Sequence, residues 1–160
     1  MRSALYTIGL LAVALAVVFA ATAGAETFNG TNGPDFYVGS NTADTVFLKG
    51  GDDTAHGRGG GDLLVGEAKA DTLYGGGGSD DIVGGPGPDH LVAGCGSPYP
   101  CSSGAGANND IAGNDGDDTL GADNGQPDTL DCGPGWDTAF VDSPSVDDWT
   151  RCEDVRVNGN

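Results

Sequence analysis

The sequence predicts an all-β protein, a right-handed parallel β-roll (β-solenoid) of nine-residue repeats with a disulfide-linked C-terminal cap. Three observations indicate this fold. Aspartate and an apolar residue recur with a period of nine over residues 30–92. Glycine supplies 30 of 160 residues while large apolar side chains are sparse, so a close-packed globular core is out of reach. Four cysteines, an even number, follow an apolar N-terminal segment.

The chain is strongly acidic, with 24 Asp and Glu residues against 6 Lys and Arg and a formal net charge of −18. Such a composition is typical of disordered chains, because too little apolar surface is buried to offset the chain entropy. The alternative is a fold that bound cations stabilise. The charge excludes nucleic acid as a partner, since phosphate binding requires Lys and Arg.

Residues 1–25 have the pattern of a secretory signal peptide. Arg2 gives a positive start, an apolar run follows from Leu5 to Ala21, and Ala23-Gly24-Ala25 is a small-residue site that places cleavage before Glu26. A single membrane anchor is the competing interpretation, but the apolar run is short for a span. We therefore expect a secreted, extracellular protein with no membrane span after cleavage.

The first repeat block lies in residues 26–92, and its seven nonapeptides begin at Gly30. The first position is glycine in every repeat except at Leu48, and the fourth is usually glycine. The eighth position is always apolar, from Tyr37 to Leu91. The sixth position is aspartate in all seven repeats: Asp35, Asp44, Asp53, Asp62, Asp71, Asp80 and Asp89.

The register breaks at a cysteine-bearing insertion, residues 93–103, and resumes in a second, degenerate block at residues 104–140. There the sixth position holds Asn109, Asp118, Asp128 and Asp137. Residues 141–160 show no repeat. Because a solenoid end exposes unpaired strand edges, we expect this tail, with Trp136 and Trp149, to form a cap.

The four cysteines, Cys95, Cys101, Cys132 and Cys152, indicate disulfides in an exported chain. Three pairings are possible. The nearest-neighbour pairing, Cys95–Cys101 and Cys132–Cys152, closes two local loops and is the one we favour. Zinc is the competing interpretation, but the spacing contains no close C-x-x-C pair.

Each column of the repeat has a physical role. The glycines permit tight turns that present carbonyl oxygens, the aspartate adds a hard anionic oxygen, and the last three residues fit a short strand. Two repeats make one coil, so Asp35, Asp53, Asp71 and Asp89 form one row and Asp44, Asp62 and Asp80 the other. Carboxylates about 4.8 Å apart repel one another. Calcium between successive coils reverses that repulsion, which predicts binding coupled to folding.

The segments GGGGSDDIV from Gly75 and GRGGGDLLV from Gly57 resemble the consensus of the RTX, or haemolysin-type, calcium-binding repeats. The resemblance is strong over residues 30–92 and weak over 104–140. It implies a parallel β-roll whose calcium ions are bound by turn carbonyls and by the sixth-position aspartates. In this chain those are Asp35, Asp44, Asp53, Asp62, Asp71, Asp80, Asp89, Asp118, Asp128 and Asp137. The ending resembles that of small Sec-exported bacterial members.

Some residues depart from the family pattern. Many relatives leave the cell in one step through a C-terminal signal, whereas this chain has an N-terminal one. Lys69, at a glycine position, and Asn109, at an aspartate position, predict weaker sites. We expect the row Asp44–Asp62–Asp80 to be the best formed.

No catalytic constellation is found in the sequence, and we expect no enzyme. His56 and His90 stand alone at different repeat positions, and no Gly-x-Ser-x-Gly elbow or phosphate-binding Gly-Lys-Ser/Thr occurs. Paired acids such as Asp80-Asp81 repeat along the chain, which favours metal ligands over a glycosidase pair. The expected function is a calcium-dependent structural or interaction module. The alternative is an adhesin or carbohydrate-recognition solenoid; an ice-binding face would need a more regular Thr ladder. The sequence identifies no protein or glycan partner.

Overall fold

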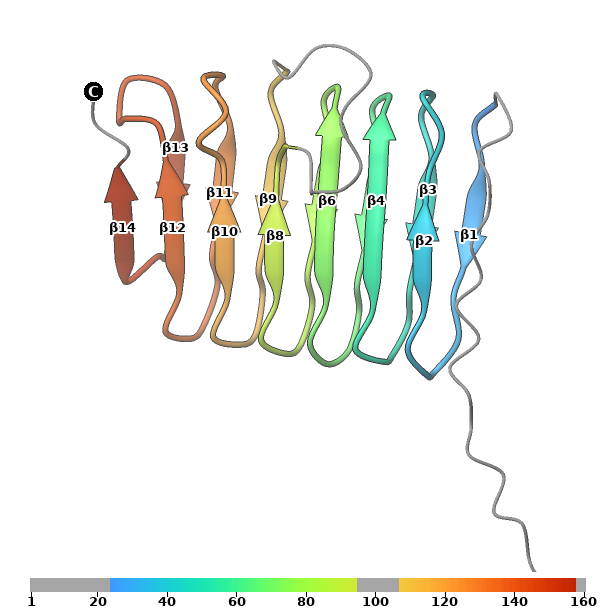
Figure 1. Ribbon diagram of the computed structural model, residues 1–160. Helices are drawn as coiled ribbons and strands as arrows, with labels where there is room; N and C mark the ends of the chain where they lie inside the picture. The colour runs from blue at the N-terminus through green and yellow to red at the C-terminus, as the bar shows by residue number, and fades with distance from the viewer. Residues whose placement is uncertain (1–23, 95–106, 158–160) are drawn as a thin grey trace, which may run out of the picture.

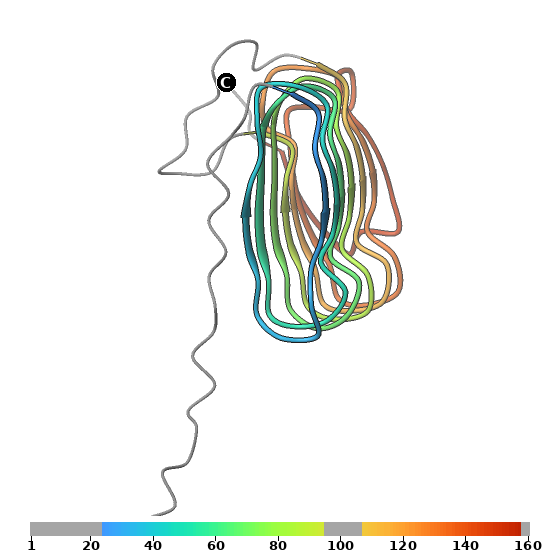
Figure 2. The same cartoon turned by 90° about the vertical axis from the view of Figure 1, so that its right-hand side faces the viewer.

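The computed structural model describes residues 24–94 and 107–157, which form fourteen short β-strands. Two strands make one coil, and the coils stack side by side into a flattened solenoid (Figure 1, Figure 2). The predicted all-β parallel β-roll is thereby confirmed. Within the described residues no helix is long and apolar enough to cross a membrane.

The strands form two seven-stranded parallel sheets, one on each side of the coil. Sheet A contains β1 (Thr27–Asn29), β3 (Thr45–Phe47), β5 (Leu63–Val65), β7 (Asp81–Val83), β9 (Asp110–Ala112), β11 (Thr129–Asp131) and β13 (Asp148–Thr150). Sheet B contains β2 (Phe36–Val38), β4 (Thr54–Gly59), β6 (Thr72–Gly77), β8 (His90–Val92), β10 (Thr119–Gly121), β12 (Thr138–Val141) and β14 (Asp154–Val157).

The strand register follows the repeat. Val46 pairs with Leu64, and Leu64 pairs with Ile82, so the chain returns to the same place after 18 residues. Across the insertion Ile82 pairs directly with Ile111, a step of 29 residues. The 11 additional residues therefore fall between β8 and β9 in the chain, and β7 and β9 remain direct neighbours in sheet A.

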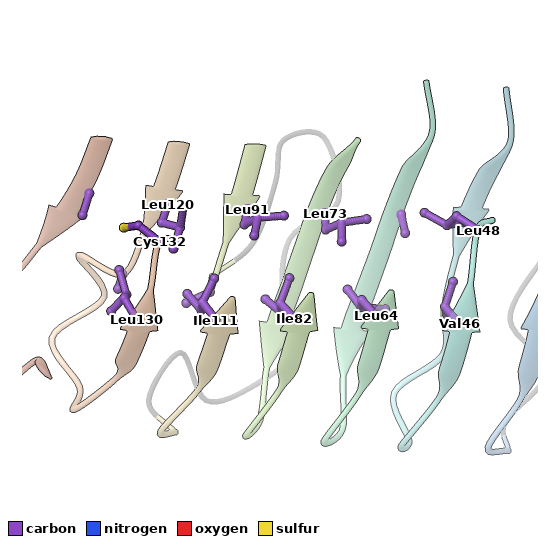
Figure 3. Packing of buried hydrophobic residues seen from close by; sticks show 14 of the residues in the cluster. Val46, Leu48, Leu64, Leu73, Ile82, Leu91, Ile111, Leu120, Leu130 and Cys132 are labelled. Atoms are coloured by element: carbon purple, nitrogen blue, oxygen red, sulfur yellow. The ribbon is translucent and has the colours of Figure 1, made fainter. Parts of the chain in front are cut away.

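The core is a thin double file of side chains, most of them from the eighth positions of the repeats in both sheets (Figure 3). Leu64 and Ile82 of sheet A face Leu73 and Leu91 of sheet B, and none of the four is exposed to solvent. Burial of one such side chain contributes about 1.5–3 kcal/mol. Because the flat coil has room for no second apolar layer, the turns must contribute the rest of the stability.

Successive turns approach each other closely, which explains the glycine at the fourth position and the strain at one exception. Gly78 has φ 124°, and a Cβ there would lie 1.6 Å from the carbonyl oxygen of Gly60. Only glycine fits such a contact. Lys69 occupies the same repeat position with φ 90°, a left-handed backbone that a lysine adopts at a cost of about 1–2 kcal/mol.

The C-terminal tail adds the last strand to each sheet. β13 pairs with β11, β14 pairs with β12, and Trp149 packs against the core. The predicted Cys132–Cys152 disulfide is present. Trp136, expected in the cap, is instead 69% exposed on a turn. The Cys95–Cys101 pair and nearly all of the signal segment lie outside the described residues.

Candidate metal centre

The sixth-position residues form a hydrogen-bonded ladder along each edge of the solenoid. In each rung the backbone N–H of one aspartate donates to Oδ1 of the aspartate one coil further on. Asp62 N donates to Asp80 Oδ1 at 2.9 Å, and Asp71 N donates to Asp89 Oδ1 at 2.9 Å. Each carboxylate is therefore held at a fixed height between two coils.

The ladders define two rows. The sheet A row runs along the turns that precede the strands of sheet A. It consists of Asp44, Asp62, Asp80, Asn109, Asp128 and Asp147. The sheet B row consists of Asp35, Asp53, Asp71, Asp89, Asp118, Asp137 and Glu153. All ten aspartates nominated from the sequence lie in these rows, and all are at most 8% exposed.

The second carboxylate oxygen, Oδ2, distinguishes two kinds of rung. Among the described residues it is buried without a hydrogen-bond donor at seven positions: Asp53, Asp62, Asp71, Asp80, Asp89, Asp118 and Asp137. A buried carboxylate oxygen without a partner is costly, because the lost hydration is not replaced. These seven oxygens require a cation or a proton.

Four rungs satisfy Oδ2 with groups of the protein itself. Thr31 N donates to Asp35 Oδ2 at 2.5 Å, and Ser40 N donates to Asp44 Oδ2 at 2.7 Å. Near the C-terminus, Asn124 Nδ2 donates to Asp128 Oδ2 at 2.8 Å and Asp142 N donates to Asp147 Oδ2 at 2.7 Å. At these rungs a protein N–H stands where a cation would otherwise be needed.

The first-position glycine opens a space into which two oxygens point. A Cβ added to Gly57 would lie 2.2 Å from Asp62 Oδ2 and 2.5 Å from the carbonyl oxygen of Gly75 in the next coil. At Gly66 the corresponding distances are 2.4 Å to Asp71 Oδ2 and 2.7 Å to the carbonyl oxygen of Gly84. A side chain of any size would close the space between carboxylate and carbonyl.

The same pairing of Oδ2 with a next-coil carbonyl occurs at Gly75, beside Asp80, and at Gly113, beside Asp118. Carboxylate and carbonyl oxygens are the ligands that calcium prefers, and it accepts six to eight of them. The residues present therefore fit a calcium ion between coils. Within residues 24–94 and 107–157 no group of three or more His, Cys, Asp or Glu converges, so a site here would depend on backbone carbonyls as much as on side chains.

Burial and neighbouring carboxylates perturb the titration of the rows. Burial, together with the charges of other aspartates, raises the pKa of Asp62, Asp80 and Asp89 to about 7. Burial likewise raises the pKa of Asp71 and Asp118 to about 6. The raised values show that the ionised rows are electrostatically unfavourable without a compensating positive charge.

The two rows differ in continuity. We expected Asp44–Asp62–Asp80 to be the best-formed row, but the sheet A row has unpartnered Oδ2 atoms only at Asp62 and Asp80. The sheet B row has five in succession: Asp53, Asp71, Asp89, Asp118 and Asp137. Asp71, whose repeat contains Lys69, keeps both its glycine space and its free oxygen.

At Asn109 the sheet A row is interrupted chemically. Asn109 Nδ2 donates to Asp128 Oδ1 at 2.8 Å and to the carbonyl oxygen of Ala107 at 3.1 Å. With Asn124 on Oδ2, both oxygens of Asp128 accept side-chain amide hydrogen bonds. This part of the row has amides in the place of a cation.

Sequence reasoning missed the last rung of each row, Asp147 and Glu153. Asp147 Oδ1 accepts a hydrogen bond from the N–H of Asp128 at 3.1 Å, and Glu153 Oε2 accepts one from the N–H of Asp137 at 3.0 Å. The equal 19-residue steps from Asn109 to Asp128 and on to Asp147 were a usable signal. Glu153 follows Asp137 by 16 residues with a different side chain, and no pattern indicated it.

The two histidines lie on the outer face of sheet B, away from the rows. His56 is buried and stacks on Tyr74, with 4.6 Å between ring centroids and 6° between planes. His90 contacts the same tyrosine edge-on at 6.1 Å. Both belong to an aromatic stack that ties adjacent coils together.

Comparison with known protein families gives one match. Residues 21–55 and 56–91 match the family model described as the RTX calcium-binding nonapeptide repeat, in four copies. No curated protein and no solved structure matches the chain.

Proposed function

We propose that this chain, whose residues 21–91 match the RTX calcium-binding nonapeptide repeat, is a secreted, non-enzymatic structural or interaction module that folds on binding calcium. It is a calcium-binding repeat protein. The finer proposal concerns where the ions are held, what they do for the fold and where the protein acts.

The observation that carries the proposal is the succession of buried, unpartnered Oδ2 atoms in the sheet B row. Neighbouring ionised carboxylates one strand spacing apart, about 4.8 Å, repel by about 3 kcal/mol at an effective dielectric constant of 20. A divalent cation between two coils converts this repulsion into attraction. Calcium would thus supply stabilisation that the thin core does not.

The geometry favours calcium binding at some rungs more than at others. Asp62, Asp71, Asp80 and Asp118 combine a free Oδ2, a first-position glycine and a convergent carbonyl, and we assign the strongest calcium ligation to them.

Other rungs lack one of these features. Leu48 and Cys132 stand at the first position of the repeats that contain Asp53 and Asp137, so these two lack the glycine. Asp35, Asp44 and Asp128 accept protein N–H groups at Oδ2 and would bind calcium only by exchanging those donors.

Two observations support an extracellular role. The signal-peptide pattern of residues 1–25 predicts export, and the Cys132–Cys152 disulfide suits an oxidising compartment. Extracellular calcium is abundant enough that even the weak sites typical of extracellular modules would be filled. The absence of an enzymatic role is supported by the repetitive use of the acidic residues and by the packed position of His56.

A calcium titration of the mature protein tests the proposal, followed by circular dichroism and by calorimetry. We expect calcium to increase β-structure and to release binding heat for several ions. Asp71→Asn keeps the Oδ1 acceptor of the Asp53 N–H but removes the charge at Oδ2, so it should lower the number of ions bound by at least one.

The matched control is Asp52→Asn, which removes the same charge from an exposed turn position. It should leave the stoichiometry unchanged. A protein that shows no binding heat and the same dichroism in calcium and in chelator would refute the proposal. Equal effects of the two variants would refute the assignment to the rows.

A further inference from the structure

The outer face of sheet A contains a hollow that the calcium rows do not use. It extends across β5, β7, β9 and β11 and has a volume of about 360 Å³. Leu63, Val83 and Ala112 form an apolar part of its lining. Ala112 lies in register between Val83 and Asp131, and its short side chain leaves the space that larger neighbours border.

The rim of the hollow is negatively charged. Asp81 and Asp110 are direct partners on adjacent strands and both are exposed. Like charges directly opposite each other destabilise a sheet. The ion pairs found among the described residues are Arg151–Asp131 and Arg156–Asp154, so no basic side chain of that part of the chain forms an ion pair with Asp81 or Asp110.

One end of the hollow already shows how this face binds a guanidinium. Arg151 donates through Nε and Nη2 to the two carboxylate oxygens of Asp131, one strand away. This bidentate pairing lowers the pKa of Asp131. Arginine and lysine also lay their aliphatic stems on apolar surface while the charged head stays hydrated.

We propose that the hollow binds a basic peptide segment of a partner protein. An arginine or lysine stem lies over Leu63, Val83 and Ala112, and its charged group reaches Asp81 and Asp110. The proposal gives a partner class to the interaction module proposed above and rests on that role, but it uses a sheet face instead of the turns. The insertion, residues 93–103, is less suited in charge to occupy the hollow, because it contains no Lys or Arg.

Binding is measured with the mature full chain at saturating calcium and about 0.15 M salt, where long-range attraction is screened beyond about 8 Å. The probe is a fluorescently labelled ten-residue peptide of alternating arginine and serine, followed by anisotropy. The same peptide with glutamate in place of arginine should not bind. Amide NMR shifts should be concentrated on β5, β7 and β9.

Two variants locate the site. The double change Asp81→Asn/Asp110→Asn should weaken binding at least tenfold, and Ala112→Leu, which fills the hollow without changing charge, should weaken it at least fivefold. The matched control, Asp52→Asn/Asp115→Asn, removes two exposed turn charges and should change binding less than twofold.

An equal loss in the hollow variant and the control would show unspecific attraction to an acidic protein and overturn the proposal, as would the absence of binding. Calcium calorimetry on the same variants separates the two claims. If the wild-type protein binds calcium but not the peptide, only the proposed peptide site is refuted. If the wild-type protein does not bind calcium, the proposed function itself is refuted.

Discussion

Replacing Asn109 by aspartate tests whether side-chain amides take the place of calcium in the sheet A row. The two side chains have nearly the same shape, and the site is 3% exposed, so the change is electrostatic. Asn109 Nδ2 donates to Asp128 Oδ1 at 2.8 Å. In the variant two carboxylate oxygens meet at that contact.

The expected penalty follows from that geometry. A hydrogen bond to a charged acceptor contributes about 1.5–3 kcal/mol. Two charges about 4 Å apart repel by about 4 kcal/mol at an effective dielectric constant of 20. Because protonation and small shifts relieve part of this, we expect Asn109→Asp to lose about 4 kcal/mol of unfolding free energy when calcium is scarce.

Calcium should reverse the loss, because the variant has a sixth-position aspartate in that rung. Each additional bound ion makes the unfolding free energy rise by about 1.4 kcal/mol more for every tenfold increase in free calcium above its dissociation constant. A thousandfold increase then recovers about 4 kcal/mol. The stability curves of variant and wild type should converge as calcium rises.

The assay is urea denaturation at a series of buffered calcium concentrations, with calorimetry for the number of ions. Asn108→Asp is the control, since it adds the same charge at an exposed neighbouring position and should leave the slope unchanged. The reasoning fails if Asn109→Asp is as stable as wild type at low calcium. It also fails if the variant remains destabilised at high calcium without binding a further ion.

Three other predictions concern a glycine beside the sheet A row, the titration of the buried carboxylates and the disulfide. Gly57→Ala should abolish one calcium site, because its Cβ would lie 2.2 Å from Asp62 Oδ2. Gly50→Ala, whose Cβ would lie 3.9 Å from its nearest non-adjacent neighbour, the carbonyl oxygen of Ala68, should bind calcium as wild type does in calorimetry. In chelator, the unfolding free energy should fall as pH rises from about 4 to about 7, because the pKa of Asp62 is raised to about 7 in the folded state and the unfolded state loses its protons first. Saturating calcium should remove that fall. An unfolding free energy that rises with pH in chelator would contradict the prediction. Reducing the Cys132–Cys152 bond, which spans 20 residues, should lower the unfolding free energy by about 3 kcal/mol, measured by denaturation with and without reductant.

The regular part of the fold could be predicted because the repeat has little freedom. A strict step of nine with glycine, aspartate and an apolar residue in fixed columns admits one stacking, and the Asp62–Asp80 and Asp71–Asp89 rungs follow from it. The same columns placed Leu64 and Leu73 in the core.

The partners of each carboxylate could not be predicted, because they depend on backbone conformation. The backbone path of one turn decides whether the Ser40 N–H reaches Asp44 Oδ2, and the repeat pattern does not predict that path. For that reason the row Asp44–Asp62–Asp80 looked stronger in the sequence than it is in the structure. Glu153 was missed because it takes the place of an aspartate with a different side chain and follows Asp137 by an irregular step of 16 residues.

The insertion and the amide rungs at Asn109 and Asp128 interrupt the sheet A row. In the chain the insertion comes before β9, and the first residue of the sheet A row after it is Asn109 instead of aspartate. Asn124 then satisfies Asp128 in the same row. The sheet B row, at the bottom of Figure 1, has free carboxylate oxygens from Asp53 to Asp137.

A calcium ion between two coils needs two successive turns of matching shape. A row that is interrupted by an insertion therefore cannot hold an unbroken series of ions. Confining the insertion and the amide rungs to the sheet A row leaves free carboxylate oxygens from Asp53 to Asp137 in the sheet B row. Calcium removal should therefore loosen the sheet B turns first, and hydrogen exchange should rise at Asp71 and Asp89 at calcium concentrations where Asn109 and Asp128 remain protected. Uniform loss of protection on both edges would contradict this asymmetry.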